Sequence, residues 1–150
     1  AQEEVRVIHA AAVFNEATDE DGNREAEQAQ DYAVIDNERA RKLGTLGVRA
    51  LETGRPASAK RMFDKALRAN PRSRLALAGL GRWALDKKRF AQAVDYLERA
   101  VKIEPRKADN RRYLGDAYAG QGRIKRARRQ YEKAASYGDA IAAERLAALE

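Results

Sequence analysis

The chain has 150 residues, of which 30 are basic and 23 acidic, and it carries a formal net charge of +7 with one histidine and no cysteine. Disulfides, cysteine nucleophiles, thiolate zinc sites and metal-binding histidine pairs are therefore excluded within one chain. No apolar run approaches the roughly 20 residues of a membrane-spanning helix. We expect a soluble, non-enzymatic protein without a metal or cofactor. The sequence leaves the compartment open between a cytoplasmic chain and one that is exported and processed.

Residues 1–38 differ from the rest of the chain in charge. They hold eleven acidic residues against Arg6 and Arg24, a net charge of −9, which leaves +16 for residues 39–150. This asymmetry predicts an acidic N-terminal helical segment beside a basic body. Two alternatives follow. The segment docks on the body of its own chain or of a neighbour, or it is a solvated helix that caps the first repeat.

Residues 4–16 predict an amphipathic helix whose apolar stripe includes Val5, Ile8 and Phe14. A turn is expected over residues 18–23, and a second helix over residues 23–35. The stripe needs cover, which favours docking.

No catalytic or metal-binding residue is predicted in this segment. His9 lies among alanines, where packing or solvent exposure is expected rather than catalysis. The acidic turn at Asp19 to Gly22 is not expected to bind calcium, because Ala17 and Gln28 stand where a calcium loop needs its first and last oxygen ligands.

Residues 40–141 contain three copies of a 34-residue unit. Each copy has a Leu-Gly pair in its first half and two alanines in its second half. The marks are Leu46-Gly47, Ala59 and Ala66, then Leu80-Gly81, Ala93 and Ala100, then Leu114-Gly115, Ala127 and Ala134. Pro71 and Pro105 end the first two copies, and Asp139 replaces the proline in the third.

Apolar residues at helical spacing predict two helices in each copy. The predicted helices span residues 40–53, 56–69, 74–87, 90–103, 108–121 and 124–137. A last helix over about 140–149 is expected to be capped by Asp139. With Ile141, Leu146 and Leu149 it covers the open end, either as a terminal cap or as the first helix of a fourth copy.

A 34-residue helical hairpin with these marks resembles the tetratricopeptide repeat family. The resemblance implies an all-α, right-handed helical-hairpin solenoid over residues 39–150, with repeats at 40–73, 74–107 and 108–141 and a terminal helix. It also implies a non-enzymatic scaffold or adaptor that binds a protein or peptide partner in a concave groove.

Small residues and turns fit this fold. Gly81 and Ala93 are expected to let two antiparallel helix backbones approach closely. Gly54 and Gly122 can supply the positive φ of a turn between helices, whereas the second copy has Lys88 there, with local strain or a different turn. Arg111 stands where the other copies have Leu43 and Leu77, which should weaken one contact.

The resemblance also implies which positions of the first helices line the groove. Here they form an apolar strip flanked by arginines, which suits an acidic peptide with apolar anchors. The candidate groove residues are Arg41, Val48, Leu51, Leu75, Ala78, Arg82, Leu85, Arg112, Tyr113 and Asp116.

Some family members grip the terminal carboxylates of heat-shock chaperones with a clamp of lysines, asparagines and an arginine. The corresponding positions here are Gly44, Val48, Gly79, Asp109 and Tyr113. None matches, so this chaperone-binding function is not predicted.

The alternative function is binding to nucleic acid or to an anionic membrane surface. Its basis is the basic patch of Lys125, Arg126, Arg128 and Arg129 on the exposed side of a second helix. No aromatic residues interleave with this patch, as base stacking needs. The partner's identity and the oligomeric state stay open, as does whether the chain is an excised fragment or a processed protein.

Overall fold

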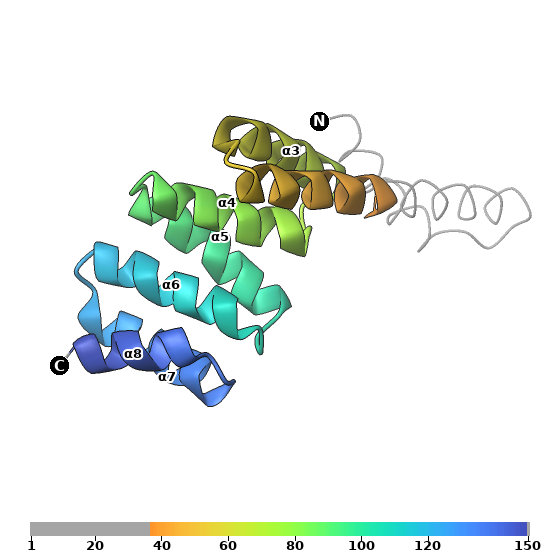
Figure 1. The fold of residues 1–150 in the computed structure, drawn as a ribbon. Coiled ribbons are helices and arrows are strands. Elements are labelled where there is room, and N and C mark those ends of the chain that lie inside the picture. The colour runs from red at the N-terminus through yellow and green to blue at the C-terminus, as the bar shows by residue number, and fades with distance from the viewer. Residues whose placement is uncertain (1–36, 150) are drawn as a thin grey trace, which may run out of the picture. The chain divides into compact units, whose positions relative to one another are not determined.

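The computed structural model describes residues 37–149. Within this range it contains seven helices and no strand (Figure 1). They are the helix at residues 37–52, α3 (Pro56–Ala69), α4 (Arg74–Asp86), α5 (Phe90–Ile103), α6 (Ala108–Gly120), α7 (Ile124–Ser136) and α8 (Ala140–Ala148). The fold is an all-α solenoid of helical hairpins, and the predicted helix boundaries agree with the structure to within three residues.

The predicted helices, turn and apolar stripe of the acidic segment, together with His9, lie outside the described residues. No described helix is long and apolar enough to cross a membrane. The described chain divides into two compact units, with the boundary between Ala76 and Leu77, inside α4.

In the first unit, residues 37–52 and α3 form a hairpin around Phe63. The Phe63 side chain is fully buried, and a Cβ atom placed on Gly47 would lie 2.5 Å from its ring. Glycine is therefore required at this position because the ring occupies the space that a side chain would take. Gly44 plays the same part toward Leu75, whose Cβ would be 2.9 Å away.

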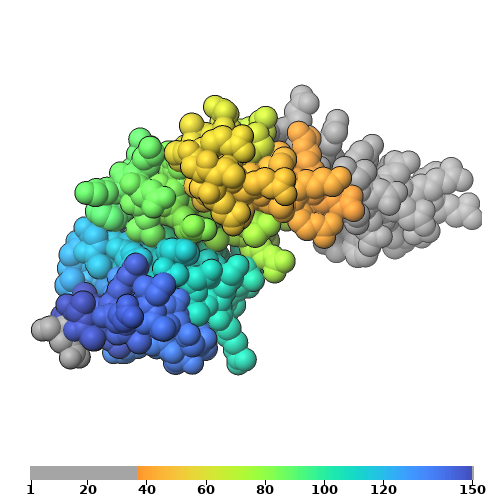
Figure 2. All heavy atoms as spheres, viewed as in Figure 1, coloured from red at the N-terminus to blue at the C-terminus, as the bar shows by residue number. Residues whose placement is uncertain are grey.

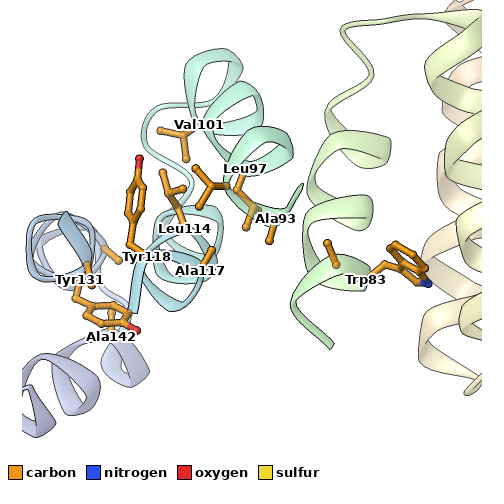
Figure 3. Packing of buried hydrophobic residues seen from close by; sticks show 13 residues of the cluster. Trp83, Ala93, Leu97, Val101, Leu114, Ala117, Tyr118, Tyr131 and Ala142 are labelled. Atoms are coloured by element: carbon orange, nitrogen blue, oxygen red, sulfur yellow. The ribbon is translucent and has the colours of Figure 1, made fainter. Parts of the chain in front are cut away.

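The second unit builds its core from α4 to α8. Leu97 and Val101 of α5 and Leu114 of α6 gather at its centre (Figure 3). The outer surface of these helices is seen in Figure 2, coloured from green to blue along the chain. A Cβ on Gly81 would lie 2.5 Å from Leu97. Glycine at this position therefore makes room for the Leu97 side chain of the next helix, which the sequence predicts to fill the space beside Gly81.

Three connections within hairpins, and the one before α8, share one turn. In each, the middle residue of three has positive φ, and the backbone N–H of the next residue donates to a carbonyl five residues earlier. The middle residues are Gly54 (φ 72°), Lys88 (φ 56°), Gly122 (φ 75°) and Gly138 (φ 96°). This confirms the prediction for Gly54 and Gly122, and it shows that Lys88 accepts the strained conformation of the same turn.

Asp139 caps α8, as predicted: its side chain accepts a hydrogen bond of 2.9 Å from the Ala142 N–H. The buried residue of this helix is Ala142, with Leu146 and Leu149 partly buried against the core. Ile141 was expected to help cover the end of the array, but it is 46% exposed. Ala142, the next residue, faces the core instead.

Leu46 also departs from its expected place. The equivalent Leu80 and Leu114 are 0% and 2% exposed, whereas Leu46 is 49% exposed. The repeat mark is therefore present in the sequence of this helix, but its leucine side chain is not buried as it is in the later copies.

Candidate functional site

The second unit contains an open pocket of about 450 Å³ between side chains of α4, α6 and α8. It brings together five of the predicted groove residues: Arg82, Leu85, Arg112, Tyr113 and Asp116. Ala78 lies on α4, half-buried and outside this lining, while Arg41, Val48, Leu51 and Leu75 lie in the first unit.

Helix periodicity explains why these side chains converge. On α4, Leu77, Leu80 and Ala84 point into the core. Arg82 and Leu85 are three residues apart and therefore share another side of the same helix, where both are half-buried.

Tyr113 lies between two guanidinium groups. The Arg112 guanidinium carbon is 4.6 Å from the centre of the Tyr113 ring, and that of Arg82 is 5.4 Å from it. Each is close enough for a cation–π interaction, which is typically worth about 0.5 to 1 kcal/mol at exposed sites. The ring is therefore held between α4 and α6 with its apolar edge available to the pocket.

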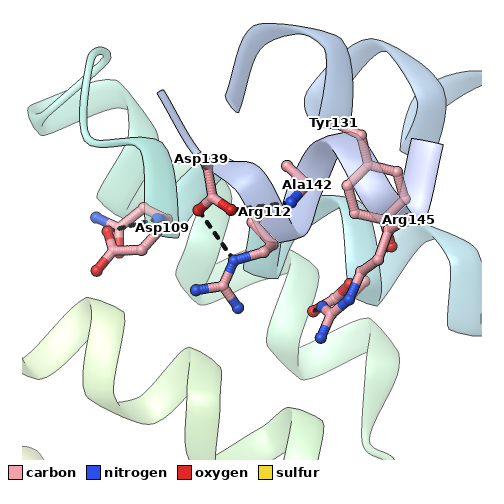
Figure 4. A network of polar contacts seen from close by, with 8 residues as sticks. Asp109, Arg112, Tyr131, Asp139, Ala142 and Arg145 are labelled. Atoms are coloured by element: carbon pink, nitrogen blue, oxygen red, sulfur yellow. Dashed lines mark hydrogen bonds and ion pairs between the residues drawn. The ribbon is translucent and has the colours of Figure 1, made fainter. Parts of the chain in front are cut away.

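Arg112 is engaged by the protein itself. Its Nε donates to Asp139 Oδ2 at 3.0 Å, and the two side chains are 13% and 9% exposed (Figure 4). Burial alone would lower the pKa of Arg112, but the hydrogen bond to Asp139 and the nearby Tyr113 outweigh it, so this pKa is raised. The expected role of Arg112 as a free carboxylate binder does not fit this geometry.

Asp139 is held as a carboxylate by the same contacts. Burial tends to raise its pKa, but the Ala142 N–H and the Arg112 guanidinium together lower it below the ordinary value of 3.8.

Asp116 is similarly occupied. The Tyr131 hydroxyl donates to its Oδ1 at 2.7 Å, and Arg145 of α8 pairs with its Oδ2. Burial, followed by the hydrogen bond to Asp116, raises the pKa of Tyr131 well above its ordinary value. Arg145 and Asp116 thus join α8 to α6 at the floor of the pocket.

Arg82 is left as the arginine that faces the pocket without an ion pair. Among residues 37–149, no carboxylate lies within 4.0 Å of its guanidinium. Because its position on the Tyr113 ring does not use its hydrogen-bonding edge, that edge can receive a carboxylate from a ligand.

Four lining residues were not predicted: Asp86, Lys88, Phe90 and Arg145. Lys88 lies in a turn, Phe90 opens a second helix, and Arg145 belongs to the terminal helix, so a count along the first helices misses them. A Cβ on Gly120 would lie 2.3 Å from the Phe90 ring. Gly120, at the end of α6, is the feature of the sequence that could have indicated this packed ring.

The basic patch on α7 surrounds a second hollow of about 310 Å³, lined by Tyr118, Arg126, Arg129, Gln130 and Lys133. Arg126 lies 5.8 Å from the centre of the Tyr118 ring, whose hydroxyl donates to Glu98. Of the other patch residues, Lys125 is exposed, and Arg128 is half-buried with its Nε lacking a hydrogen-bond partner among the described residues.

Arg111, which stands at a leucine position of the repeat, is buried and hydrogen-bonded. It is 9% exposed; its Nε donates to the Pro105 carbonyl at 2.9 Å and its Nη1 to Gln130 at 3.2 Å. The expected loss of one apolar contact is therefore replaced by hydrogen bonds that tie α6 to the preceding turn and to α7. In the described part of the chain, no cluster of three or more histidine or acidic side chains could hold a metal ion.

The fold defines a class: a helical-hairpin repeat protein of the kind that serves as an interaction scaffold. Family models described as tetratricopeptide repeats match residues 45–110 and 84–149. The chain belongs to the tetratricopeptide repeat family, whose repeats generally serve as non-catalytic protein-interaction modules. No curated protein sequence matches the chain.

Several solved structures share the fold. The first tetratricopeptide domain of Spaghetti (RPAP3), bound to an HSP90 peptide, is 18% identical with a TM-score of 0.71, over 75% of this chain and 91% of that one. A mutant O-GlcNAc transferase of Thermobaculum terrenum is 22% identical with a TM-score of 0.70, over 76% of this chain and 22% of that one. A MamA double mutant is 20% identical with a TM-score of 0.68, over 96% of this chain and 83% of that one.

Proposed function

We propose that this chain is an interaction scaffold whose pocket between α4, α6 and α8 binds a peptide with a carboxylate next to an apolar side chain. The observation that carries the proposal is Arg82, which stacks near Tyr113 and has no carboxylate within 4.0 Å among residues 37–149. Leu85 and Phe90 line the same pocket. Of the cations that line the pocket, Arg82 and Lys88 have no ion pair among the described residues, and both lie beside this apolar surface.

Arg82 differs from the other two arginines of the pocket, because those two are paired with carboxylates of the protein. Because Arg112 and Arg145 already hold Asp139 and Asp116, they fix α6 and α8 and do not compete for the ligand. A hydrogen bond to a charged group contributes about 1.5 to 3 kcal/mol. An apolar anchor on Leu85 and Phe90 adds about 25 cal/mol for each Å² of apolar surface buried.

The Spaghetti domain is solved with a bound HSP90 peptide. We propose a different recognition chemistry for this chain, because the five positions of the carboxylate clamp hold Gly44, Val48, Gly79, Asp109 and Tyr113. We assign the ligand carboxylate to Arg82, beside the Tyr113 ring, rather than to a clamp of that type.

The test uses the full chain and a random peptide library displayed on phage. A recovered peptide is synthesised in two forms, with each Glu or Asp kept or replaced by its amide, and affinity is measured by calorimetry. Arg82→Gln should weaken binding of the acidic form about tenfold or more, equal to about 1.4 kcal/mol. Its effect on the amide form should be small.

Arg68→Gln is the matched control, because Arg68 is an exposed arginine of α3, far along the chain from the pocket. Tyr113→Ala should weaken both forms of the peptide. If Arg82→Gln and Arg68→Gln have the same effect, or if the acidic and amide peptides bind equally, Arg82 does not receive a ligand carboxylate.

We propose binding of an anionic polymer at the α7 hollow as the second candidate function. Arg126, Arg129 and Lys133 line that hollow, and none has an ion pair among the described residues. The test is titration with single-stranded DNA and with vesicles containing phosphatidylserine. Binding that falls steeply with salt and is lost in Arg126→Gln with Arg129→Gln, but not in Arg82→Gln, would support this candidate.

A further inference from the structure

The helix at residues 37–52 has an exposed side that the other repeats bury. Lys42, Leu46 and Arg49 follow one another at spacings of four and three residues, so they lie on one side of this helix. All three are exposed, and we call them the first-helix face. Neither Lys42 nor Arg49 has a carboxylate partner among residues 37–149.

A step of 34 residues shows what this side does elsewhere in the array. The equivalent residues are buried in both later copies. They are Ala76, Leu80 and Trp83 at 0%, 0% and 7% exposure, and Asn110, Leu114 and Ala117 at 1%, 2% and 0%. The first-helix face therefore lies where the other copies have a buried surface, but it carries two charged side chains in place of uncharged ones.

The residues in which this face differs from the later copies indicate the chemistry of a surface that would cover it. Leu46 keeps the leucine that the repeat has in each copy, and it is the most exposed of the large apolar side chains in the described residues. The two cations flank it where the other copies have uncharged side chains. A complementary surface would place an apolar side chain on Leu46 and carboxylates beside Lys42 and Arg49.

We propose that residues 1–36 of the same chain dock on the first-helix face. This segment holds ten acidic and two basic residues, for a net charge of −8, and it contains the large apolar residues Val5, Ile8 and Phe14. It has both properties that the face requires. Because it directly precedes residue 37, docking is intramolecular and its effective concentration is high.

Charge directs this docking and apolar contact maintains it. Exposed ion pairs are typically worth about 0 to 1 kcal/mol each, whereas burying a large apolar side chain contributes about 1.5 to 3 kcal/mol. The peptide pocket is a poorer site for the segment, since two of its arginines are already paired with Asp139 and Asp116.

The experiment exploits the absence of cysteine. A nitroxide is attached to Ala10→Cys in the full chain, and the methyl resonances of leucines are observed by NMR. The Leu46 methyl signals should lose most of their intensity, while those of Leu85, in the peptide pocket, should keep theirs. Lys42→Glu with Arg49→Glu should restore the Leu46 signals.

Lys65→Glu with Arg68→Glu is the matched control, because it reverses two exposed charges of α3 and gives the same net charge. The control should leave the broadening of Leu46 unchanged. Mixing spin-labelled chains with isotope-labelled, cysteine-free chains tests for a second copy on the face. Broadening in that mixture, broadening centred on Leu85, no broadening at Leu46, or equal loss in the control would each overturn the proposal.

Discussion

Arg112 and Asp139 join α6 to the start of α8 through one side-chain contact of 3.0 Å. The same carboxylate accepts the Ala142 N–H at 2.9 Å and so caps α8. A single aspartate therefore begins the last helix and fixes it to the third hairpin. Since both side chains are largely withdrawn from water, the pair is screened less than an exposed pair would be.

Replacement of Asp139 should separate these two roles. Asp139→Asn keeps a side chain suited to an N-cap but removes the charge that faces Arg112, whereas Asp139→Ala removes both. We expect Asp139→Asn to lower the free energy of unfolding by about 1 to 3 kcal/mol, and Asp139→Ala by about 1 kcal/mol more. Urea denaturation followed by circular dichroism measures both. Equal stability of the parent and Asp139→Ala would contradict the assignment.

The contribution of Asp139 should depend on pH. Its pKa is lowered in the folded protein, so it stabilises the fold above its ordinary pKa of 3.8, and this stabilisation is lost as the pH falls through the folded value. The difference in stability between the parent and Asp139→Asn should therefore be constant near neutral pH and shrink in acid below about pH 4. A difference that grows in acid would have the wrong sign for this pair.

Gly81→Ala should destabilise the chain by about 1 to 3 kcal/mol, because the new Cβ would lie 2.5 Å from Leu97. The double variant with Leu97→Ala tests the cause. If the clash is with Leu97, adding Gly81→Ala to Leu97→Ala should cost much less than it does in the parent. Thermal and urea unfolding of the four proteins gives this coupling, and strictly additive effects would place the clash elsewhere.

The four shared turns predict opposite effects of exchanging glycine and lysine. Lys88→Gly should stabilise the chain by about 0.5 to 1 kcal/mol, since Lys88 has a φ of 56°. Gly122→Lys should destabilise it by a similar amount, and by backbone strain alone, because no atom lies within 4 Å of a Cβ at that position. Denaturation midpoints that move in the same direction for both variants would contradict a common turn.

Tyr131 should make the fold sensitive to alkali. Its pKa is raised by burial and by Asp116, so its contribution is complete below its ordinary pKa of 10.0 and is lost as the pH rises toward the folded value. Above pH 10 the free energy of unfolding of the parent should fall more steeply than that of Tyr131→Phe, by up to about 1.4 kcal/mol per pH unit. Tyr137→Phe, which alters an exposed ring, is the matched control.

The helices could be predicted because their signals are local and repeated. A 34-residue spacing of leucine, glycine and alanine fixes the hairpins, and the glycines mark the turns. The candidate pocket was predicted in part: five groove residues converge, but the pattern on the first helices could not show that Arg112 is paired. That pairing depends on Asp139, which lies 27 residues further along the chain.

The remaining differences have a common physical origin in the ends of the array. Leu46 carries the repeat mark but is 49% exposed, whereas the equivalent Leu80 is buried, and Ala142 rather than Ile141 takes the buried position in α8. Arg111 shows a different limit. From the sequence, an arginine at a leucine position predicts the loss of an apolar contact. The structure shows that the guanidinium instead donates hydrogen bonds to the Pro105 carbonyl and to Gln130.

The turn before α8 has a consequence for enlarging this protein by gene duplication. Successive first helices α4 and α6 begin 34 residues apart, at Arg74 and Ala108, but α8 begins at Ala140, two residues ahead of that phase. A leucine–glycine pair placed after α7 by the 34-residue count would therefore be rotated by about 200° around the axis of α8, relative to its place in α4 and α6. The connection of Tyr137, Gly138 and Asp139 is one residue shorter than the four-residue, proline-containing connections after α3 and α5, and α7 is also one residue shorter than those helices. Tandem copies should keep the 34-residue phase only when one residue is added to each.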